Sequence, residues 1–336
     1  MRLMEGNRLD PALRGHLPQR RRLLDRLEAG RLSASMLFSG PEGIGKRRVA
    51  MELAQRELCF RRTACGRCEG CLYFHSDPLP LELPNLLRIA PEGKAGLIRI
   101  GVIREDDLVE GGVIRWAHQA PPPHCHRWIL VEDAHRLHGA SANMLLKTLE
   151  EPPPGTHFIL VTHRPDAVLQ TIRSRCERLT FLPLGEGEAW NIAQAAGWEE
   201  SDRTCWSALS MGTLRYLDPA DFARATSQVE AWLALGRGSH FSEISAALLP
   251  DKASGRAQGE QMAQALGILL LVLSDLGRLR LGREPHLGPW RAGLEAMLPR
   301  ALDLGSLQQA TLGHLRNLGR NPGAELVLRD MAMSLE

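Results

Sequence analysis

The sequence lacks a strong net charge and a long uninterrupted apolar run. Its 41 Lys and Arg nearly balance its 39 Asp and Glu, which leaves a net charge of +2 over 336 residues. So small a charge gives no overall field that would draw the chain to nucleic acid or to a membrane. The most apolar stretch, residues 265–276, falls short of the ~18 residues that span a bilayer. It is interrupted by Gly267, Ser274 and Asp275, so we expect a buried helix there.

The chain also lacks a recognisable signal peptide, internal repeats and low-complexity linkers. The N-terminus has no charged segment followed by an apolar one, and we therefore expect a cytoplasmic protein with no membrane partner. In such a protein, seven cysteines indicate a metal site or free thiols instead of a disulfide framework. The length is enough for two or three domains, each with its own core.

Apolar runs alternate with helical patterns over the first half of the chain. The predicted strands are residues 36–39, 86–90, 127–131, 157–162 and 178–181. The predicted helices are residues 17–30, 47–58, 141–149 and 167–173, and residues 98–116 begin extended and become helical. This alternation predicts a parallel sheet in an α/β domain. Beyond residue 183 only helical patterns follow, over 186–217 and 220–335, with residues 239–260 predicted as a loose connection.

A glycine-rich loop joins the first predicted strand to the next helix. Residues 39–48 read SGPEGIGKRR, with Gly40, Gly43, Gly45 and Lys46 in a pattern close to G-x-x-x-x-G-K-[ST]. The missing feature is the final hydroxyl residue, which would hold Mg²⁺, and Arg47 stands in its place. The loop amides and Lys46 still offer an anion site at a helix N-terminus. The sequence leaves two hypotheses open, a nucleotide bound without hydrolysis and a loop that binds nothing.

The predicted strand 127–131 ends in Glu132 and Asp133. A working ATPase has the reverse order, in which the Asp helps to hold Mg²⁺ and the Glu positions water. Exchanging the two acids changes the reach of each carboxylate by one methylene, and reactive geometry tolerates little displacement. Together with Arg47, this order argues against efficient hydrolysis.

A cluster of four cysteines follows the predicted loop helix, with the spacing C-x5-C-x2-C-x2-C: Cys59, Cys65, Cys68 and Cys71. Four thiolates can surround one Zn²⁺ tetrahedrally at ~2.3 Å and leave no position for water, so the predicted metal is structural. The alternative is a set of unrelated free thiols. The remaining cysteines are expected to be ordinary small buried residues: Cys125, Cys176 and Cys205.

Residues 174–176 read SRC, between a short predicted helix and the last predicted strand. An arginine at such an edge can act as a finger that stabilises charge on a phosphate held by a neighbouring subunit. The alternative for Arg175 is an ordinary surface salt bridge.

Residues 134–181 strongly resemble the clamp-loader AAA+ family. The segments NMLLKTLEEPP, FILVT and TIRSRC are that family's signature, and the cysteine cluster is similar to the zinc module of its bacterial members. The C-terminal LRNLGRNPGAELVLRDMAMSL looks like the closing helix of the family's collar domain. The resemblance implies an AAA+ RecA-like core over 1–182 with a zinc module at about 59–75, a helical lid over 183–218 and a helical collar over 219–336.

Arg47 and the reversed acids depart from the family's ATPase subunits and resemble its non-hydrolysing delta-prime branch, which serves bacterial DNA polymerase III. The resemblance implies that Arg175 acts as a finger in trans, and that Thr162 and Arg215 are the two sensors of a vestigial or weak ATP site. Its implied partners are the gamma/tau ATPase subunits, the delta subunit, the sliding clamp and, through the complex, primed DNA.

The sequence raises two alternative functions. An active gamma/tau-type ATPase would need a hydroxyl side chain where Arg47 stands. A DNA-binding zinc protein would need a second ligand pair and a recognition helix, which the cysteine cluster lacks.

Overall fold

The computed structural model describes residues 15–76, 78–91, 98, 112–137, 139–249, 256–299, 302–317 and 323–335. The chain divides into two units, Met1–Glu188 and Ala189–Glu336, each described here by itself. Most of the segment predicted to turn from extended to helical, residues 98–116, lies outside the described residues. Its described end forms the helix α5 (Gly112–His118).

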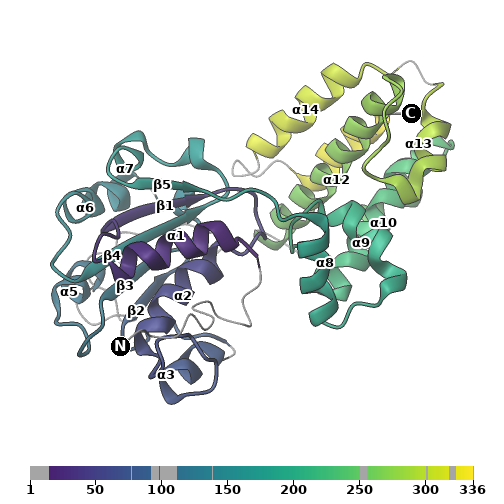
Figure 1. Cartoon of the computed structure of the whole chain (residues 1–336). Coiled ribbons are helices and arrows are strands. Elements are labelled where there is room, and N and C mark those ends of the chain that lie inside the picture. Colours follow the sequence, from purple (N-terminus) through teal and green to yellow (C-terminus); the bar gives the residue numbers. More distant parts are fainter. Residues whose placement is uncertain are drawn as a thin grey trace. The chain divides into compact units, whose positions relative to one another are not determined.

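The first unit is built on a five-stranded parallel sheet with the order β2-β3-β4-β1-β5 (Figure 1). The strands are β1 (Ser35–Ser39), β2 (Leu86–Ile89), β3 (Arg127–Val131), β4 (Thr156–Thr162) and β5 (Glu177–Thr180). β1 lies between β4 and β5, with Leu37 opposite Leu160 on one side and Arg178 on the other. All pairs of neighbouring strands are parallel, which confirms the predicted α/β sheet.

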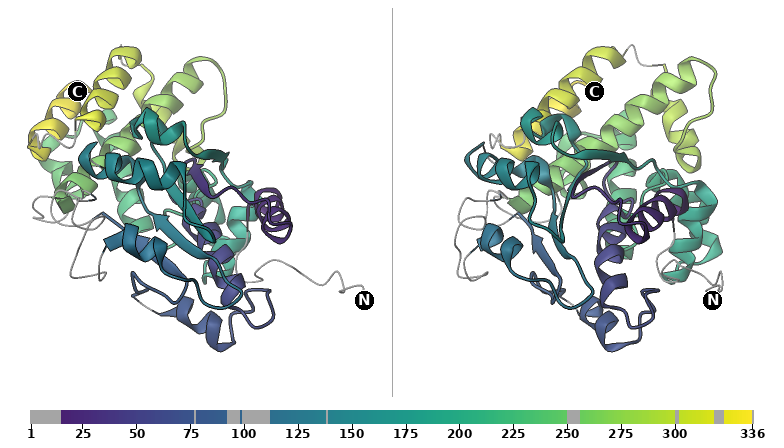
Figure 2. Two further views of the ribbon diagram at one scale, coloured as in Figure 1. Left: turned by 90° about the vertical axis from the view of Figure 1, so that its left-hand side faces the viewer. Right: turned by 60° about the vertical axis from the view of Figure 1, so that its left-hand side comes forward.

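Helices cover both faces of this sheet, which is why its central strands are continuous apolar runs. The described residues of this unit form the helices α1 (Leu17–Glu28), α2 (Lys46–Leu58), α3 (Glu69–Leu72), α5, α6 (Gly139–Glu150) and α7 (Gln170–Arg173). Phe38 and Leu130 pack with the residues of α1 and α2, whereas Leu37 and Ile129 pack with those of α5 and α6. Both views of Figure 2 show the purple α1 on one side of the sheet and the blue α5 on the other.

Two arginines fasten α1 to the rest of the first unit. Arg20 donates to both carboxylate oxygens of Glu52 on α2, at 2.8 and 2.9 Å, and both side chains are almost fully buried. Arg26 pairs with Glu177 at the start of β5. A buried pair with this two-point geometry is specific in orientation, so α1 has a fixed place beside the glycine loop.

The second unit contains helices and no strand among its described residues. They are α8 (Glu186–Ala195, which starts before the unit boundary), α9 (Arg203–Ser210), α10 (Pro219–Gly236), α11 (Phe241–Leu248), α12 (Arg256–Arg280), α13 (Arg291–Met297), α14 (Leu304–Arg316) and α15 (Ala324–Met333). The prediction of a loose connection over 239–260 was wrong in part, because α11 forms there. Phe241, Ile244 and Leu248 lie on one face of α11 and are buried.

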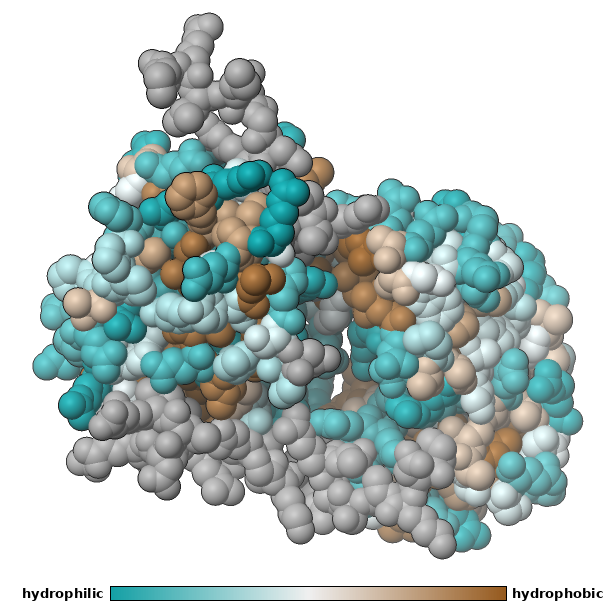
Figure 3. All heavy atoms as spheres, turned by 90° about the horizontal axis from the view of Figure 1, so that it is seen from below, coloured by the Kyte–Doolittle hydropathy of each residue, from teal (hydrophilic) through white to brown (hydrophobic). Residues whose placement is uncertain are grey.

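The helix α12 confirms the prediction of a buried helix over residues 265–276. Leu266, Leu269 and Leu273 are fully buried, and α12 packs against α10, α13, α14 and α15. Its segment Gln258–Arg280 is long and apolar enough to cross a membrane, but half of its most apolar part is buried in the structure. A core helix passes the same test of length and composition. The face shown in Figure 3 is mainly hydrophilic, with apolar side chains in small separate groups.

Candidate nucleotide loop and metal centre

The glycine loop between β1 and α2 has a backbone that its glycines make possible. Gly40, Gly43 and Gly45 have φ values of 145°, 74° and 93°, in the region that side chains other than glycine rarely adopt. A Cβ atom on Gly40 would lie 2.2 Å from the carbonyl oxygen of Phe181. The predicted order of strand, glycine loop and helix is confirmed, with Gly45 as the N-cap of α2.

Lys46 is turned back onto its own loop. Its Nζ donates to the carbonyl oxygens of Gly40 and Pro41 at 2.8 and 2.5 Å, and the residue is 5% exposed. Burial lowers the pKa of Lys46 to about 8, against the opposing charges of Glu42 and Asp133. A phosphate group in this loop would therefore have to take the ammonium group away from two carbonyl acceptors.

Arg47 binds the carboxylate at the end of β3. Its Nη1 lies 3.1 Å from Oε2 of Glu132, and Arg88 on β2 lies 2.7 Å from Oε1 of the same carboxylate. In a working ATPase the residue after the loop lysine and the acid at the strand end hold Mg²⁺. Here a guanidinium group stands at the first position and neutralises the acid at the second. Arg88 was not predicted as a site residue, and its local signal is a single arginine within the apolar strand LLRIA.

The second strand-end acid lies in a separate group of polar side chains. Asp133 has a φ of 49°, and its Oδ1 lies 3.5 Å from Nδ1 of His163, directly after β4. The Nδ1 atom of His135 lies 3.1 Å from the hydroxyl of Thr162, which also accepts from the backbone of Arg164 at 3.0 Å. Thr162, the predicted first sensor, is therefore fully buried at this strand end. Neither histidine was predicted as a site residue, although His163 directly follows Thr162 and His135 lies two residues after the strand-end acid Asp133.

The predicted finger residue Arg175 forms a salt bridge in this chain. Its Nε lies 3.0 Å from Oε2 of Glu150, the last residue of α6, and its Nη1 donates to the carbonyl of Thr171. Its side chain is 32% exposed and that of Glu150 is 59% exposed. The predicted second sensor, Arg215, belongs to the second unit and lies in a turn after α9.

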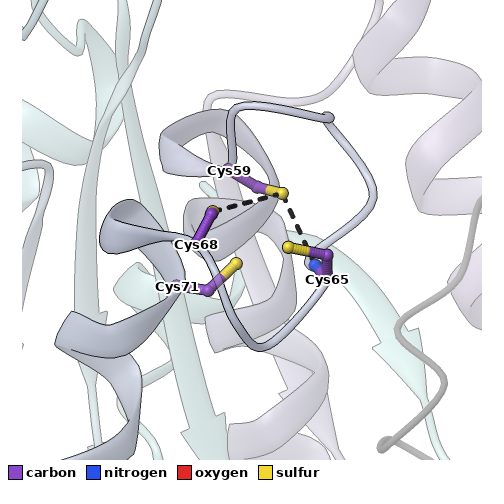
Figure 4. A group of neighbouring side chains, drawn as sticks. All are labelled: Cys59, Cys65, Cys68 and Cys71. Atoms are coloured by element: carbon purple, nitrogen blue, oxygen red, sulfur yellow. Dashed lines mark hydrogen bonds between the residues drawn. The ribbon is translucent and has the colours of Figure 1, made fainter.

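The four clustered cysteines meet around one point (Figure 4). Cys59 is the C-cap that follows α2, Cys68 is the N-cap of α3 and Cys71 lies within α3. The four sulfur atoms all lie within 4.8 Å of one another, and those of Cys59 and Cys68 are 3.8 Å apart. A tetrahedron with metal–sulfur bonds of ~2.3 Å has edges of about 3.8 Å, so this donor set fits Zn²⁺.

The thiols of this cluster have unequal acidity. Burial would raise the pKa of the Cys59 thiol, but the backbone amides of Cys65, Thr63 and Arg61 together lower it to about 6. Burial raises the pKa of Cys71 to about 12, and the neighbouring Cys59 adds to the effect. Several thiolates so close together repel one another, and a divalent cation among them removes that repulsion.

The three other cysteines were predicted to be ordinary buried residues. Cys176 is buried, whereas Cys125 and Cys205 are only partly buried. Burial raises the pKa of the Cys176 thiol to about 12, as expected for an unreactive side chain. The prediction was therefore correct for Cys176 and overstated the burial of the other two.

Comparison with known proteins identifies relatives among the subunits of DNA polymerase III. A family model described as DNA polymerase III, delta subunit, matches residues 17–185, half of the chain. The subunit delta' of Pseudomonas aeruginosa is 36% identical over 143 residues, which cover 42% of this chain and 40% of that protein. The subunit gamma/tau of Mycobacterium tuberculosis is 35% identical over 164 residues, which cover 46% of this chain and 25% of that protein.

The chain thus spans less than half the length of either sequence relative. A solved structure, the DNA polymerase III gamma-subunit-related protein of Thermotoga maritima, aligns with 93% of this chain and 97% of its own, at 17% identity and a TM-score of 0.48.

The residues matched by the family model include all five strands, the glycine loop, the cysteine cluster and Arg175. They are the parts of the chain on which the sequence resemblance was based. The chain belongs to the DNA polymerase III delta-subunit family, among the clamp-loader proteins that its sequence resembles.

Proposed function

We propose that this protein is a subunit of a DNA polymerase III clamp loader that does not hydrolyse ATP itself. In the proposed complex it supplies Arg175 to the ATP site of an adjacent gamma/tau ATPase subunit. With the delta subunit, the assembly loads the sliding clamp onto primed DNA in the cytoplasm. The single observation that carries the proposal is the ion pair between Arg47 and Glu132.

The ion pair bears on hydrolysis because Mg²⁺ needs oxygen ligands. The metal would be held between the side chain after the loop lysine and the acid at the strand end. Arg47 provides no oxygen, and both carboxylate oxygens of Glu132 already accept from guanidinium groups. A divalent cation would have to displace two positive charges before it reached this carboxylate. Without a seated Mg²⁺, the charge that develops on a transferred phosphoryl group has no metal to neutralise it.

The proposed function still allows the glycine loop to bind ATP without hydrolysing it. The loop amides at the start of α2 and Lys46 still form an anion site, with Gly40, Gly43 and Gly45 giving the loop its shape. Because Lys46 must leave two carbonyl acceptors, we expect any ATP binding to be weak. Thr162 and Arg215 are the proposed sensors of this vestigial site.

Arg175 suits a role in trans because its only ionic partner among the described residues is the exposed Glu150, and its one further contact there is a hydrogen bond to the carbonyl of Thr171. Exposed ion pairs contribute about 0–1 kcal/mol, so a stronger partner easily replaces Glu150. A nucleotide phosphate in a neighbouring subunit is such a partner, since it carries more charge and accepts from both guanidinium edges. Arginine fingers supplied in this way can raise phosphoryl-transfer rates by orders of magnitude.

We assign the four-cysteine cluster to one structural Zn²⁺ per chain, bound by Cys59, Cys65, Cys68 and Cys71. The ion would contribute folding energy to the segment after α2, because all four coordination positions are protein ligands. We also propose that residues 183–218 form a helical lid and that residues 219–336 form a collar, which serves assembly with the other subunits.

A gamma/tau-type ATPase is the second candidate, favoured by the 35% identity to gamma/tau and by the presence of Lys46 and Thr162. Steady-state ATP hydrolysis by the purified chain separates the two functions. We expect no turnover above background with Mg²⁺ present, and the same result for Lys46→Ala. Turnover at a rate typical of motor subunits, abolished by Lys46→Ala, would reverse the assignment. Equilibrium ATP binding with and without Mg²⁺ then distinguishes an occupied loop from an empty one.

A further inference from the structure

A group of three metal-ligand side chains lies apart from the cysteine cluster, at the carboxyl ends of β3 and β4. Asp133 directly follows β3, His135 lies in the short helix η2 (Ala134–Arg136), and His163 directly follows β4. One ligand atom from each lies within 4.8 Å of those of the other two. We propose that Asp133, His135 and His163 form a second metal site, which binds a divalent first-row transition-metal ion such as Co²⁺, Ni²⁺ or Zn²⁺.

The observed distances fit coordination without a large rearrangement. Metal–nitrogen and metal–oxygen bonds of ~2.1 Å at tetrahedral angles place two ligand atoms about 3.4 Å apart. Oδ1 of Asp133 lies 3.5 Å from Nδ1 of His163, which is close to that separation. The rings of His135 and His163 meet edge to face, with centroids 4.5 Å apart, so the two imidazoles converge on one region.

The backbone and the neighbouring side chains hold these ligands in place. Asp133 has a left-handed φ of 49°, a conformation that costs energy and recurs where a site fixes a side chain. The hydroxyl of Thr162 contacts Nδ1 of His135 and limits rotation of the ring. Such partners around a ligand usually orient it and contribute to metal affinity. Arg136 lies 4.0 Å from the other oxygen of Asp133, Oδ2, and leaves Oδ1 on the side of His163.

The charge states of the group also suit a cation. Burial, with the neighbouring His163, lowers the pKa of His135 to about 4, so its ring is neutral at physiological pH. Burial would raise the pKa of Asp133, but hydrogen bonding to His163 and nearby positive charges hold it below its usual value. A neutral imidazole and an ionised carboxylate are the forms that bind metals.

The donor set decides which ions the site would take. Two imidazoles and one carboxylate favour transition metals, whereas Mg²⁺ and Ca²⁺ prefer oxygen ligands alone. Three protein ligands leave at least one position open, in contrast to the closed four-cysteine site. The ion would be exchangeable and would lie near the glycine loop, since the charge of Asp133 acts on Lys46. Metal binding at these three side chains does not depend on whether the chain hydrolyses ATP.

Titration of the full-length, zinc-loaded chain with Co²⁺ tests the proposal. We expect one Co²⁺ per chain, detected by calorimetry, with weak visible absorption typical of nitrogen and oxygen ligands. Zinc content is measured before and after, because Co²⁺ that entered the cysteine site would release Zn²⁺ and give an intense sulfur-to-cobalt band. Binding should weaken at least tenfold in His163→Gln and in His135→Gln, as expected when a metal ligand is lost.

His118→Gln is the matched control, because His118 is exposed on α5 and belongs to no metal-ligand group among the described residues. It should bind Co²⁺ as tightly as the parent. If a histidine variant does not fold, Asp133→Asn tests the same site, because it keeps the side-chain shape and removes the charged ligand. The proposal is overturned if the parent binds no Co²⁺ beyond its zinc, or if His163→Gln and Asp133→Asn bind as tightly as His118→Gln.

Discussion

Glu132 has two arginine partners of very different burial, and this difference determines what each contributes to stability. The side chain of Arg88 is 8% exposed and also donates to the carbonyl of Leu79, whereas that of Arg47 is 54% exposed. Removing Arg88 leaves the largely buried Glu132 with only the exposed Arg47 as a partner and takes a donor from the carbonyl of Leu79. Breaking a buried ion pair in this way is strongly destabilising. Removing the exposed partner leaves Glu132 paired with Arg88, so the carboxylate remains neutralised.

We therefore predict that Arg88→Met lowers the free energy of unfolding by about 3 kcal/mol. Arg47→Met, which removes a charge of the same kind from the same carboxylate, should cost less than about 1 kcal/mol. Urea denaturation of the two variants and the parent measures both values. Equal losses in the two variants would show that Arg47 is held more tightly than its exposure indicates.

The buried side chain of His16 makes the stability of the fold depend on pH. Its Nε2 lies 2.6 Å from the carbonyl of Ile44 in the glycine loop, and its ring meets the ring of Phe181 edge to face. Burial lowers the pKa of His16 below its usual value, against the hydrogen bond to Ile44. The folded chain thus resists protonation at this ring, while the unfolded chain takes up a proton below pH ~6.5.

The contribution of His16 is fully present above pH ~6.5 and is lost as the pH falls below that value. We predict that His16→Asn, which tolerates the left-handed backbone at this position, loses less stability than the parent between pH 7.5 and pH 5. Urea midpoints at the two pH values measure the difference. A parallel decline in both proteins would assign the acid sensitivity to other groups.

At the scale of elements, the geometry of the four-cysteine cluster depends on how closely α3 approaches the end of α2. Gly70 on α3 lies so close to α2 that a Cβ atom there would be 2.0 Å from the carbonyl oxygen of Leu58. Backbone cannot give way as a flexible side chain does. Any side chain at Gly70 must therefore move α3, which carries Cys71, away from Cys59 at the end of α2.

We predict that Gly70→Ala weakens zinc binding at least tenfold, because one of the four ligands loses its position. Gly139→Ala at the start of α6 is the control, since a Cβ atom there would meet nothing within 4 Å. Competition with a chromophoric chelator gives the affinities. Unchanged affinity in Gly70→Ala would mean that the module repacks without loss of its ligands.

Substitution of one of the four cysteines tests the proposed zinc site directly, because it removes a ligand. Cys68→Ser should release the zinc, whereas Cys205→Ser, in the second unit, should retain one ion per chain. Elemental analysis of protein purified without chelators measures both. Parent protein without zinc would contradict the assignment of this site.

At the scale of the whole molecule, the proposed role of Arg175 requires a partner subunit. We predict that Arg175→Ala leaves assembly of the reconstituted clamp loader intact but lowers its DNA- and clamp-stimulated ATPase at least tenfold, since a finger stabilises the transition state. Glu150→Gln, which releases Arg175 from its salt bridge, should leave that activity intact. Arg178→Ala removes an exposed arginine from the same segment and serves as the control. Unchanged stimulated activity in Arg175→Ala would remove this residue from the mechanism.

The sequence by itself determined those features that depend on neighbours in the chain. Alternating apolar runs and helical patterns predicted the five strands and the helices between them, because periodicity is local. The spacing of four cysteines within 13 residues predicted the four-cysteine cluster, and the glycines predicted the loop, for the same reason. The short helix α11 was missed because Gly, Ser and Lys around it indicated a connection, while its three apolar residues found partners only in the folded unit.

Only the tertiary structure decided what each charged side chain binds. Arg88 and Arg47 lie 44 and 85 residues from Glu132 in the chain, and no local pattern links them. They meet because parallel strands bring their carboxyl ends to one edge of the sheet, next to the loop after β1. At the same edge, His163 after β4 lies beside Asp133 after the neighbouring strand β3. The sequence thus predicted that the hydroxyl side chain needed to bind Mg²⁺ is absent. The fold decided that the guanidinium group of Arg47, which stands at that position, helps to neutralise Glu132.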